Sequence, residues 1–104
     1  MELKVIYSST AKRDLKEIYT YISRDSIRYA KREIELIRFS VKKLKSNPFI
    51  GRKFEKFDAE LTRELIFKNY RIIYDIVVDR QIIILSVHHH ARLIGNNPAF
   101  RDED

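Results

Sequence analysis

The 104-residue sequence contains no cysteine, and it has only two glycines and two prolines. The absence of cysteine excludes disulfide bonds, thiol catalysis and any zinc site built on cysteine. The longest apolar runs, such as the one at 82–85, are far too short to cross a membrane, and residues 1–7 lack the long apolar stretch of a signal peptide. The length fits one domain. We therefore expect a single-domain cytoplasmic protein with no membrane partner.

Positive charge is in excess. The chain has 21 Lys and Arg residues against 15 Asp and Glu residues, which gives a formal net charge of +6. Residues 95–104 contain one Arg and three acidic residues, so they carry −2 and residues 1–94 carry +8. A domain this basic favours an anionic partner such as nucleic acid, the ribosome or an acidic polypeptide, although the charge also serves solubility. We predict one domain over 1–94 and a short acidic tail over 95–104.

Two segments in the first half have the periodicity of amphipathic helices. Apolar residues recur at helical spacing over 11–23, and again over 27–44 at steps of three and four. Polar residues at 8–10 and 25–26 supply side-chain oxygens for the N-caps of both helices. Pro48 should end the second helix, because the residue before a proline is biased out of the helical region. The break between the segments is short, so we expect a helical hairpin.

The remaining segments predict strands. Residues 3–7 alternate in the manner of a strand, and from Leu61 onward the period is again two. Short turns at 68–69 and 79–80 require antiparallel pairing, so residues 61–88 should form a three-strand meander. The predicted fold class is α+β, in the order β-α-α-β-β-β. The helical hairpin should pack on one face of a small, mainly antiparallel sheet.

The second face of this sheet is expected to remain uncovered. We predict that it carries Arg63 and Arg71, with His89 beside them, and that it forms a concave basic binding surface. The alternative for Arg71 is a structural role, in which it pairs with Glu64 or Asp75. The alternative for Arg63 is a solvated surface charge.

The size, the element order and three local patterns resemble the RelE/ParE superfamily of toxins. The match extends over residues 3–94. The patterns are Ser9-Thr10-Ala11 with Asp14-Leu15 and Ile18-Tyr19-Tyr21-Ile22, then Asn47-Pro48 with Gly51-Arg52, and finally Arg63-Glu64-Leu65, Asn69-Tyr70-Arg71-Ile72-Ile73-Tyr74 and Ile84-Leu85-Ser86-Val87-His88-His89-His90-Ala91-Arg92. This resemblance implies the toxin of a bacterial type II toxin–antitoxin system of the plasmid-stabilisation kind. Its partner would be a cognate antitoxin, and it would reach operator DNA only through that antitoxin.

The resemblance implies one of two activities, which the fold does not separate. RelE-like members cut mRNA in the ribosomal A site, and ParE-like members poison DNA gyrase. As a RelE-like ribonuclease, the chain would act without a metal or other cofactor, through the catalytic residues Arg63, Arg71, His90 and Arg92. However, only one basic residue stands on the strand before the turn, and no Tyr follows Arg92.

We therefore expect a ParE-like toxin that binds and inhibits DNA gyrase. The target-binding residues would be Arg63, Arg71, His88 and Arg92. A further alternative is a protein of the same fold that only binds nucleic acid.

The run His88-His89-His90 has three interpretations. Acid–base chemistry is one, because an ordinary histidine titrates near neutral pH. A metal site is the second, but on a strand only His88 and His90 share a face, so we expect none. The third, which we favour, is that His88 packs and forms hydrogen bonds at the end of the sheet.

The tyrosines of the helical hairpin are candidates for a contact with the antitoxin. We expect a groove beside the hairpin to receive an antitoxin helix or strand. The predicted antitoxin-binding residues are Leu15, Tyr19, Tyr21 and Tyr29. The apolar stripe of the second helix has under three heptads, so core packing is favoured over coiled-coil dimerisation.

Overall fold

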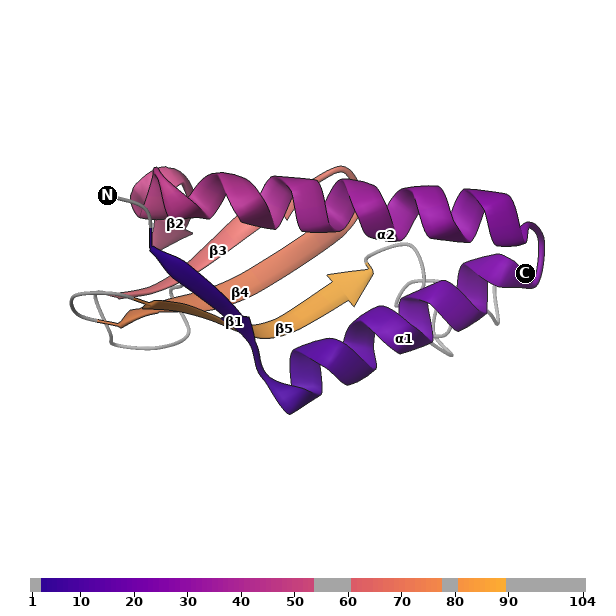
Figure 1. Ribbon diagram of the computed structural model, residues 1–104, viewed down its shortest axis with the longest axis horizontal. Coiled ribbons are helices and arrows are strands. Elements are labelled where there is room, and N and C mark those ends of the chain that lie inside the picture. Colours follow the sequence, from indigo (N-terminus) through magenta and orange to yellow (C-terminus); the bar gives the residue numbers. More distant parts are fainter. Residues whose placement is uncertain (1–2, 54–60, 78–80, 90–104) are drawn as a thin grey trace, which may run out of the picture.

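The structure is a computed structural model that describes residues 3–53, 61–77 and 81–89, and in it two helices cover one face of a five-stranded sheet (Figure 1). The strand order is β1-β5-β4-β3-β2; β1 pairs with β5 in parallel, and the other pairs are antiparallel. The predicted fold class and the meander are therefore confirmed. The elements are β1 (Lys4–Tyr7), α1 (Ser9–Ser23), α2 (Ile27–Lys42), η1 (Lys43–Lys45), η2 (Pro48–Ile50), β2 (Arg52–Lys53), β3 (Thr62–Phe67), β4 (Tyr70–Val77) and β5 (Gln81–His89).

Both helices begin at the serine caps that the sequence predicts. The Oγ of Ser8 accepts a 3.0 Å hydrogen bond from the N–H of Ala11, and the Oγ of Ser26 accepts one of 3.0 Å from Tyr29. Each cap satisfies a backbone donor that has no partner inside the helix. The second helix is shorter than expected. It ends at Lys42 and continues as the 3-10 turn η1, because the chain tightens ahead of Pro48.

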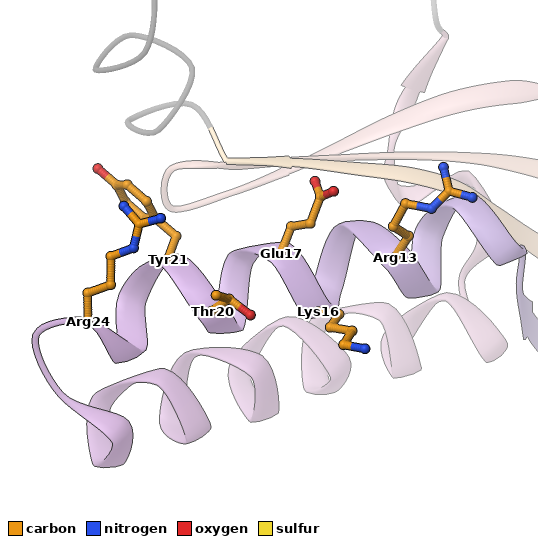
Figure 2. Close-up of a pocket in the computed structure, with 6 residues that line it drawn as sticks. All are labelled: Arg13, Lys16, Glu17, Thr20, Tyr21 and Arg24. Carbon is orange, nitrogen blue, oxygen red and sulfur yellow. The ribbon is translucent and has the colours of Figure 1, made fainter.

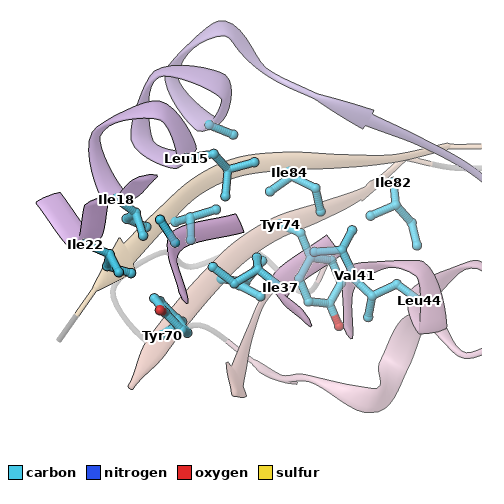
Figure 3. Close-up of a cluster of buried hydrophobic side chains, with 14 residues drawn as sticks. Leu15, Ile18, Ile22, Ile37, Val41, Leu44, Tyr70, Tyr74, Ile82 and Ile84 are labelled. Carbon is cyan, nitrogen blue, oxygen red and sulfur yellow. The ribbon is translucent and has the colours of Figure 1, made fainter. Parts of the chain in front are cut away.

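Alternation along the strands places one side of the sheet under the helices. Tyr70, Ile72 and Tyr74 on β4 are buried, as are Ile82 and Ile84 on β5. Figure 3 shows several of these side chains in one cluster with residues of α1 and α2. From the helices the core receives Ala11, Leu15, Ile18 and Ile22 on α1, Ala30, Ile37 and Val41 on α2, and Leu44 on η1. The stripe of the second helix is therefore core, as favoured over a coiled coil. No helix in the described ranges is long and apolar enough to cross a membrane.

The start of α1 forms hydrogen bonds with the edge of β5 beyond the point where β1 ends. The N–H of Ser8 donates to the carbonyl of Ile84 at 3.0 Å, and its hydroxyl donates to the carbonyl of Leu85 at 2.9 Å. One turn further along, the carboxylate of Asp14 accepts a 2.9 Å hydrogen bond from the N–H of Val87. These bonds replace a strand ladder, since buried backbone groups need partners. They give a structural reason for Ser8 before α1 and for Asp14 within it.

Candidate functional site

The open face of the sheet carries a charged cluster that we call the Arg71 cluster, formed by Arg52, Glu64 and Arg71. Residues directly opposite on paired strands share a face. Arg52 lies opposite Glu64 on β2 and β3, and Arg71 lies opposite Ile66 on β3 and His88 on β5. The Glu64 carboxylate is 2.9 Å from Nε of Arg52 and 3.1 Å from Nε of Arg71.

The cluster is asymmetric in its exposure. The side chain of Glu64 is only 8% exposed, whereas Arg52 is 69% and Arg71 46% exposed. Two outward guanidinium groups therefore flank one buried carboxylate. The pairing of Arg71 with Glu64 is the structural alternative that the sequence left open. It leaves the cluster with a net charge of one positive unit.

Arg63 does not join Arg71, and the expectation that both lie on the open face is wrong. Arg63 is opposite Tyr74, a buried residue on the helix-covered face. Its guanidinium lies 4.8 Å from the ring centroid of Phe49, and its Nη1 donates to the carbonyl of Gly51 at 3.3 Å. The expectation fails because β3 is nearly the edge strand of the sheet. On an edge a long polar side chain can lie on the core side and still reach solvent.

The histidines are also distributed differently from the prediction. His89, expected on the open face, is opposite Tyr70 and stacks on its ring with a centroid distance of 4.8 Å. The ring of Tyr21 contacts the ring of His89 edge-on, with 5.9 Å between the ring centroids. His88, which was expected to pack at the end of the sheet, is instead exposed, with Nε2 3.4 Å from the Oγ of Ser86. The packing role therefore belongs to His89, because the β-bulge between Ile73 and Tyr74 shifts the register of β5.

Two of the predicted site residues, His90 and Arg92, lie outside the described residues, as does the tail over 95–104. In the ranges that are described, no group of three His, Cys, Asp or Glu residues is arranged to hold a metal ion.

The expected antitoxin-binding residues divide into core and surface. Leu15 is 4% exposed and belongs to the core, so it offers no surface to a partner. Tyr19 is partly buried against the same core. Tyr21 and Tyr29, by contrast, line one pocket of about 220 Å³ between the end of the helical hairpin and the β3–β4 turn. Tyr29 is 50% exposed there. The structure therefore brings two of the four residues together at a hollow on the surface.

Glu33 also lines this pocket and was not among the predicted site residues. It is 3% exposed, and its carboxylate accepts hydrogen bonds from the hydroxyl of Tyr70 at 2.8 Å and from Nζ of Lys68 at 3.0 Å. Burial pushes the pKa of Glu33 upward, but the hydrogen bonds from Lys68 and Tyr70 outweigh it and hold this pKa below its usual value. Burial and the bond to Glu33 raise the pKa of Tyr70. A lone Glu on the apolar stripe between Ala30 and Ile37 was the available signal.

A second pocket, of about 290 Å³, opens along α1 (Figure 2). Arg13, Glu17 and Tyr21 project on the side of α1 that faces β5, and the guanidinium of Arg24 lies 5.8 Å from the Tyr21 ring centroid. Lys16 and Thr20 complete the lining. Tyr21 thus lines both pockets, and it is the expected antitoxin-binding residue that the two pockets share.

The Asn47-Pro48 and Gly51-Arg52 pattern has a structural basis in Tyr74. The buried hydroxyl of Tyr74 donates to the carbonyl of Pro48 at 2.6 Å and accepts from the N–H of Gly51 at 3.0 Å. A Cβ atom on Gly51 would lie 2.6 Å from that hydroxyl and 2.7 Å from the carbonyl oxygen of Glu64. Glycine is therefore required here by close approach. The contact positions Arg52 beside Glu64.

Comparisons with known proteins agree with this geometry. Residues 5–94 match the family model described as the ParE toxin of the type II toxin–antitoxin system parDE. The chain therefore belongs to the ParE toxin family of type II toxin–antitoxin systems. Among curated proteins, none matches this sequence.

Several solved structures share the fold. The chromosomal ParDE toxin–antitoxin system from P. aeruginosa superposes with a TM-score of 0.69 at 20% identity, over 85% of this chain and 96% of the other. The RelBE2 toxin–antitoxin complex from Mycobacterium tuberculosis gives 0.60 at 22% identity, over 86% and 99%. The YoeB dimer from Staphylococcus aureus gives 0.58 at 23% identity, over 86% and 99%. At these identities the similarity establishes the fold alone.

Proposed function

We propose that this toxin acts by binding and inhibiting DNA gyrase and that a cognate antitoxin neutralises it. The observation that carries the proposal is the separation of Arg63 and Arg71 on opposite faces of the sheet. Cleavage of RNA requires several groups that converge on one phosphate, including cations free to stabilise the charged transition state. Arg63 is occupied by Phe49 and Gly51, and Arg71 by Glu64. Arg63 and Arg71, the two cations expected to act together in a ribonuclease, therefore lie on opposite faces and do not converge on one phosphate.

The open face suits a protein target instead. It presents two exposed guanidinium groups, from Arg52 and Arg71, anchored on a buried carboxylate. Arginines held in this way are common at the centre of protein interfaces, where their planar groups form directional hydrogen bonds. Ile66 and Val77 lie on the same face and are 51% and 39% exposed, which adds apolar area.

One observation favours the second candidate, ribosome-dependent cleavage of mRNA. Arg71 and His88 are directly opposite each other on β4 and β5, and both are exposed on the open face. A cation beside an imidazole is a minimal arrangement for phosphate chemistry. It lacks the second cation that Arg63 was expected to supply.

Two assays separate these functions. The purified chain is added to gyrase with relaxed plasmid, and separately to translating ribosomes with a defined mRNA. We expect blocked supercoiling and intact mRNA, together with a DNA-damage response in cells. Codon-specific cuts in the mRNA with normal supercoiling would instead establish the second candidate.

The antitoxin is tested through Tyr21 and Tyr29, which line the 220 Å³ pocket. Expression of the toxin alone should arrest growth, and co-expression of the small protein encoded beside it should restore growth. Changing both tyrosines to Ala should weaken the complex of toxin and antitoxin by at least about tenfold, since aromatic anchors dominate such interfaces. Normal growth at high toxin yield without a partner would argue against a toxin.

A further inference from the structure

The outer surface of α2 and η1 holds most of the net charge of the chain. Residues 27–45 contain seven Lys and Arg residues and two Glu residues, a net of +5 against +6 for the whole sequence. One of the two acids, Glu33, is buried and bonded to Lys68 and Tyr70. The other, Glu35, is exposed. We call the seven cations the α2 basic stripe: Arg28, Lys31, Arg32, Arg38, Lys42, Lys43 and Lys45.

Four cations of the stripe share one side of the helix, and residues 33–37 between them hold no cation. Lys31, Arg38 and Lys42 follow at steps of seven and four, and Lys45 follows three residues later, a spacing that keeps side chains on one side of a helix. From Arg28 to Lys45 the stripe extends about 25 Å at 1.5 Å per residue. Figure 1 shows α2 along the long dimension of the molecule, with its outer side turned away from the sheet.

No carboxylate in the described part of the chain forms an ion pair with any cation of this stripe, although Glu35 stands among them. The arginines of the open face, by contrast, share Glu64. Cations in a row without anionic partners repel each other, and this repulsion destabilises the folded protein. A bound polyanion removes the repulsion. The cations of the stripe are therefore available to an external partner of negative charge.

An open pocket of about 190 Å³ lies beside the stripe, between β1 and α2. Three stripe cations, Arg38, Lys42 and Lys45, converge on it, and its remaining lining is Val5, Tyr7 and Val41. The guanidinium of Arg38 is held 5.3 Å from the ring centroid of Tyr7. Three cations around one hollow give a phosphate group several donors at once.

We propose that the α2 basic stripe binds the phosphate backbone of duplex DNA, with the 190 Å³ pocket between β1 and α2 receiving one phosphate. At 3.4 Å per base pair, the 25 Å stripe matches about seven base pairs. This binding is direct and independent of sequence, because the stripe consists of cations that contact phosphates and not bases. It adds to the proposed action on gyrase and does not depend on it.

A polypeptide partner fits the same surface less well. Peptides bound to a groove rely on apolar anchors in addition to charge. Ile27 and Tyr29 are exposed at the N-terminal end of α2, at 59% and 50%. Phe39 is exposed at 61% in the middle of the stripe, and the Nζ of Lys43 lies 5.2 Å from its ring centroid. Charge is therefore the dominant feature, and a regularly charged polyanion is its complement.

The test is fluorescence anisotropy of a labelled 20-base-pair duplex with the purified full-length chain, over a series of salt concentrations. The wild type should bind with a Kd of about 10⁻⁶ to 10⁻⁴ M at physiological salt. Replacing Lys31 and Lys42 with Gln should weaken binding at least about tenfold and reduce the slope of log K against log salt by about two. Replacing Glu35 with Gln should strengthen binding.

The matched control replaces Lys4 and Lys12 with Gln, which removes the same charge from β1 and α1. We expect this control to leave affinity within about twofold of the wild type, and circular dichroism checks that all variants fold. Equal losses in both double variants would overturn the proposal, because net charge alone would then explain binding. So would no binding at low salt. A preference for poly-glutamate over the duplex, with a large loss on Phe39→Ala, would assign the stripe to an acidic polypeptide and also overturn it.

Discussion

The carboxylate of Asp14 on α1 accepts a 2.9 Å hydrogen bond from the backbone N–H of Val87 on β5. This side chain takes the place of a neighbouring strand, because β1 pairs with β5 only as far as Ile84. Beyond that point the end of β5, which carries His88 and His89, is held by the helix. Asp14 therefore holds the part of β5 that carries His88 on the open face and His89 on the helix-covered face.

We predict that Asp14→Ala destabilises the protein by about 1–3 kcal/mol, because the partly buried N–H of Val87 loses its acceptor. Asp14→Asn keeps an acceptor oxygen and should cost less. Urea denaturation of both variants measures this difference. The control is Asp25→Ala, at an exposed position outside the helices. Equal stability of Asp14→Ala and wild type would show that water replaces the carboxylate and that α1 does not hold β5.

Gly51 and Tyr74 should be coupled. Gly51→Ala places a Cβ 2.6 Å from the Tyr74 hydroxyl and 2.7 Å from the carbonyl oxygen of Glu64, and it should cost about 1–3 kcal/mol of stability. Tyr74→Phe removes the hydrogen bonds to Pro48 and Gly51 and should cost a similar amount. In the double variant the closest clash is gone. Its loss of stability should therefore be smaller than the sum of the losses in the two single variants. Thermal unfolding of all four proteins completes the cycle, and strict additivity would contradict the contact.

Glu33 should make stability depend on pH. The pKa of this carboxyl is held below its usual value, so folding favours the ionised form. Its contribution is complete above the unfolded-state pKa, about 4.3 for a free Glu, and it is lost as the pH falls through the lower folded-state pKa. Tyr70→Phe removes one of the two donors and leaves Glu33 partly unsatisfied, at a cost of about 1–3 kcal/mol near neutral pH.

The same change should move acid unfolding to higher pH, because the folded-state pKa of Glu33 rises toward its ordinary value. Denaturation series between about pH 3 and 7 follow both effects. Tyr29→Phe is the matched control, since Tyr29 lines the same pocket and is 50% exposed. Identical acid profiles for Tyr70→Phe and wild type would show that Glu33 does not control the pH dependence of stability.

Most of the fold could be predicted because it depends on local signals. The serine caps at Ser8 and Ser26, the two helical stripes and the turn at Lys68 each act within a few residues of the sequence. Lys68 even adopts the left-handed conformation, with φ of 54°, that a tight hairpin turn requires. Such signals keep their meaning without knowledge of distant partners.

The site was harder to predict because it depends on register. A shift of one residue moves a side chain to the opposite face, and neither the bulge at Ile73/Tyr74 nor the pairing of Arg63 with Tyr74 has a local signature. This is why Arg63 and His89 were assigned to the wrong face. Glu33 was missed for a different reason: its partners, Lys68 and Tyr70, are 35 and 37 residues away in the sequence.

The last prediction concerns Arg71, and it uses Arg52 as its control. Both arginines contact the same carboxylate of Glu64, at 3.1 and 2.9 Å, so Arg71→Ala and Arg52→Ala each remove one cation from one buried acid. Only Arg71 lies opposite His88. If the toxin inhibits gyrase through this face, both variants should weaken inhibition by a similar and partial amount, below about tenfold, because each removes one contact of a broad interface.

A ribonuclease would separate the two variants. Arg71→Ala would then remove charge stabilisation from the transition state and lower mRNA cleavage by roughly a hundredfold or more, whereas Arg52→Ala would leave it nearly intact. The measurement is the dose of each purified variant that halves gyrase supercoiling, beside the rate of mRNA cutting on translating ribosomes. We expect the two gyrase doses to rise together, with no mRNA cut by any variant. A large loss confined to Arg71→Ala in the ribosome assay would make Arg71 and His88 catalytic residues, because Arg52 contacts the same carboxylate but does not lie opposite His88.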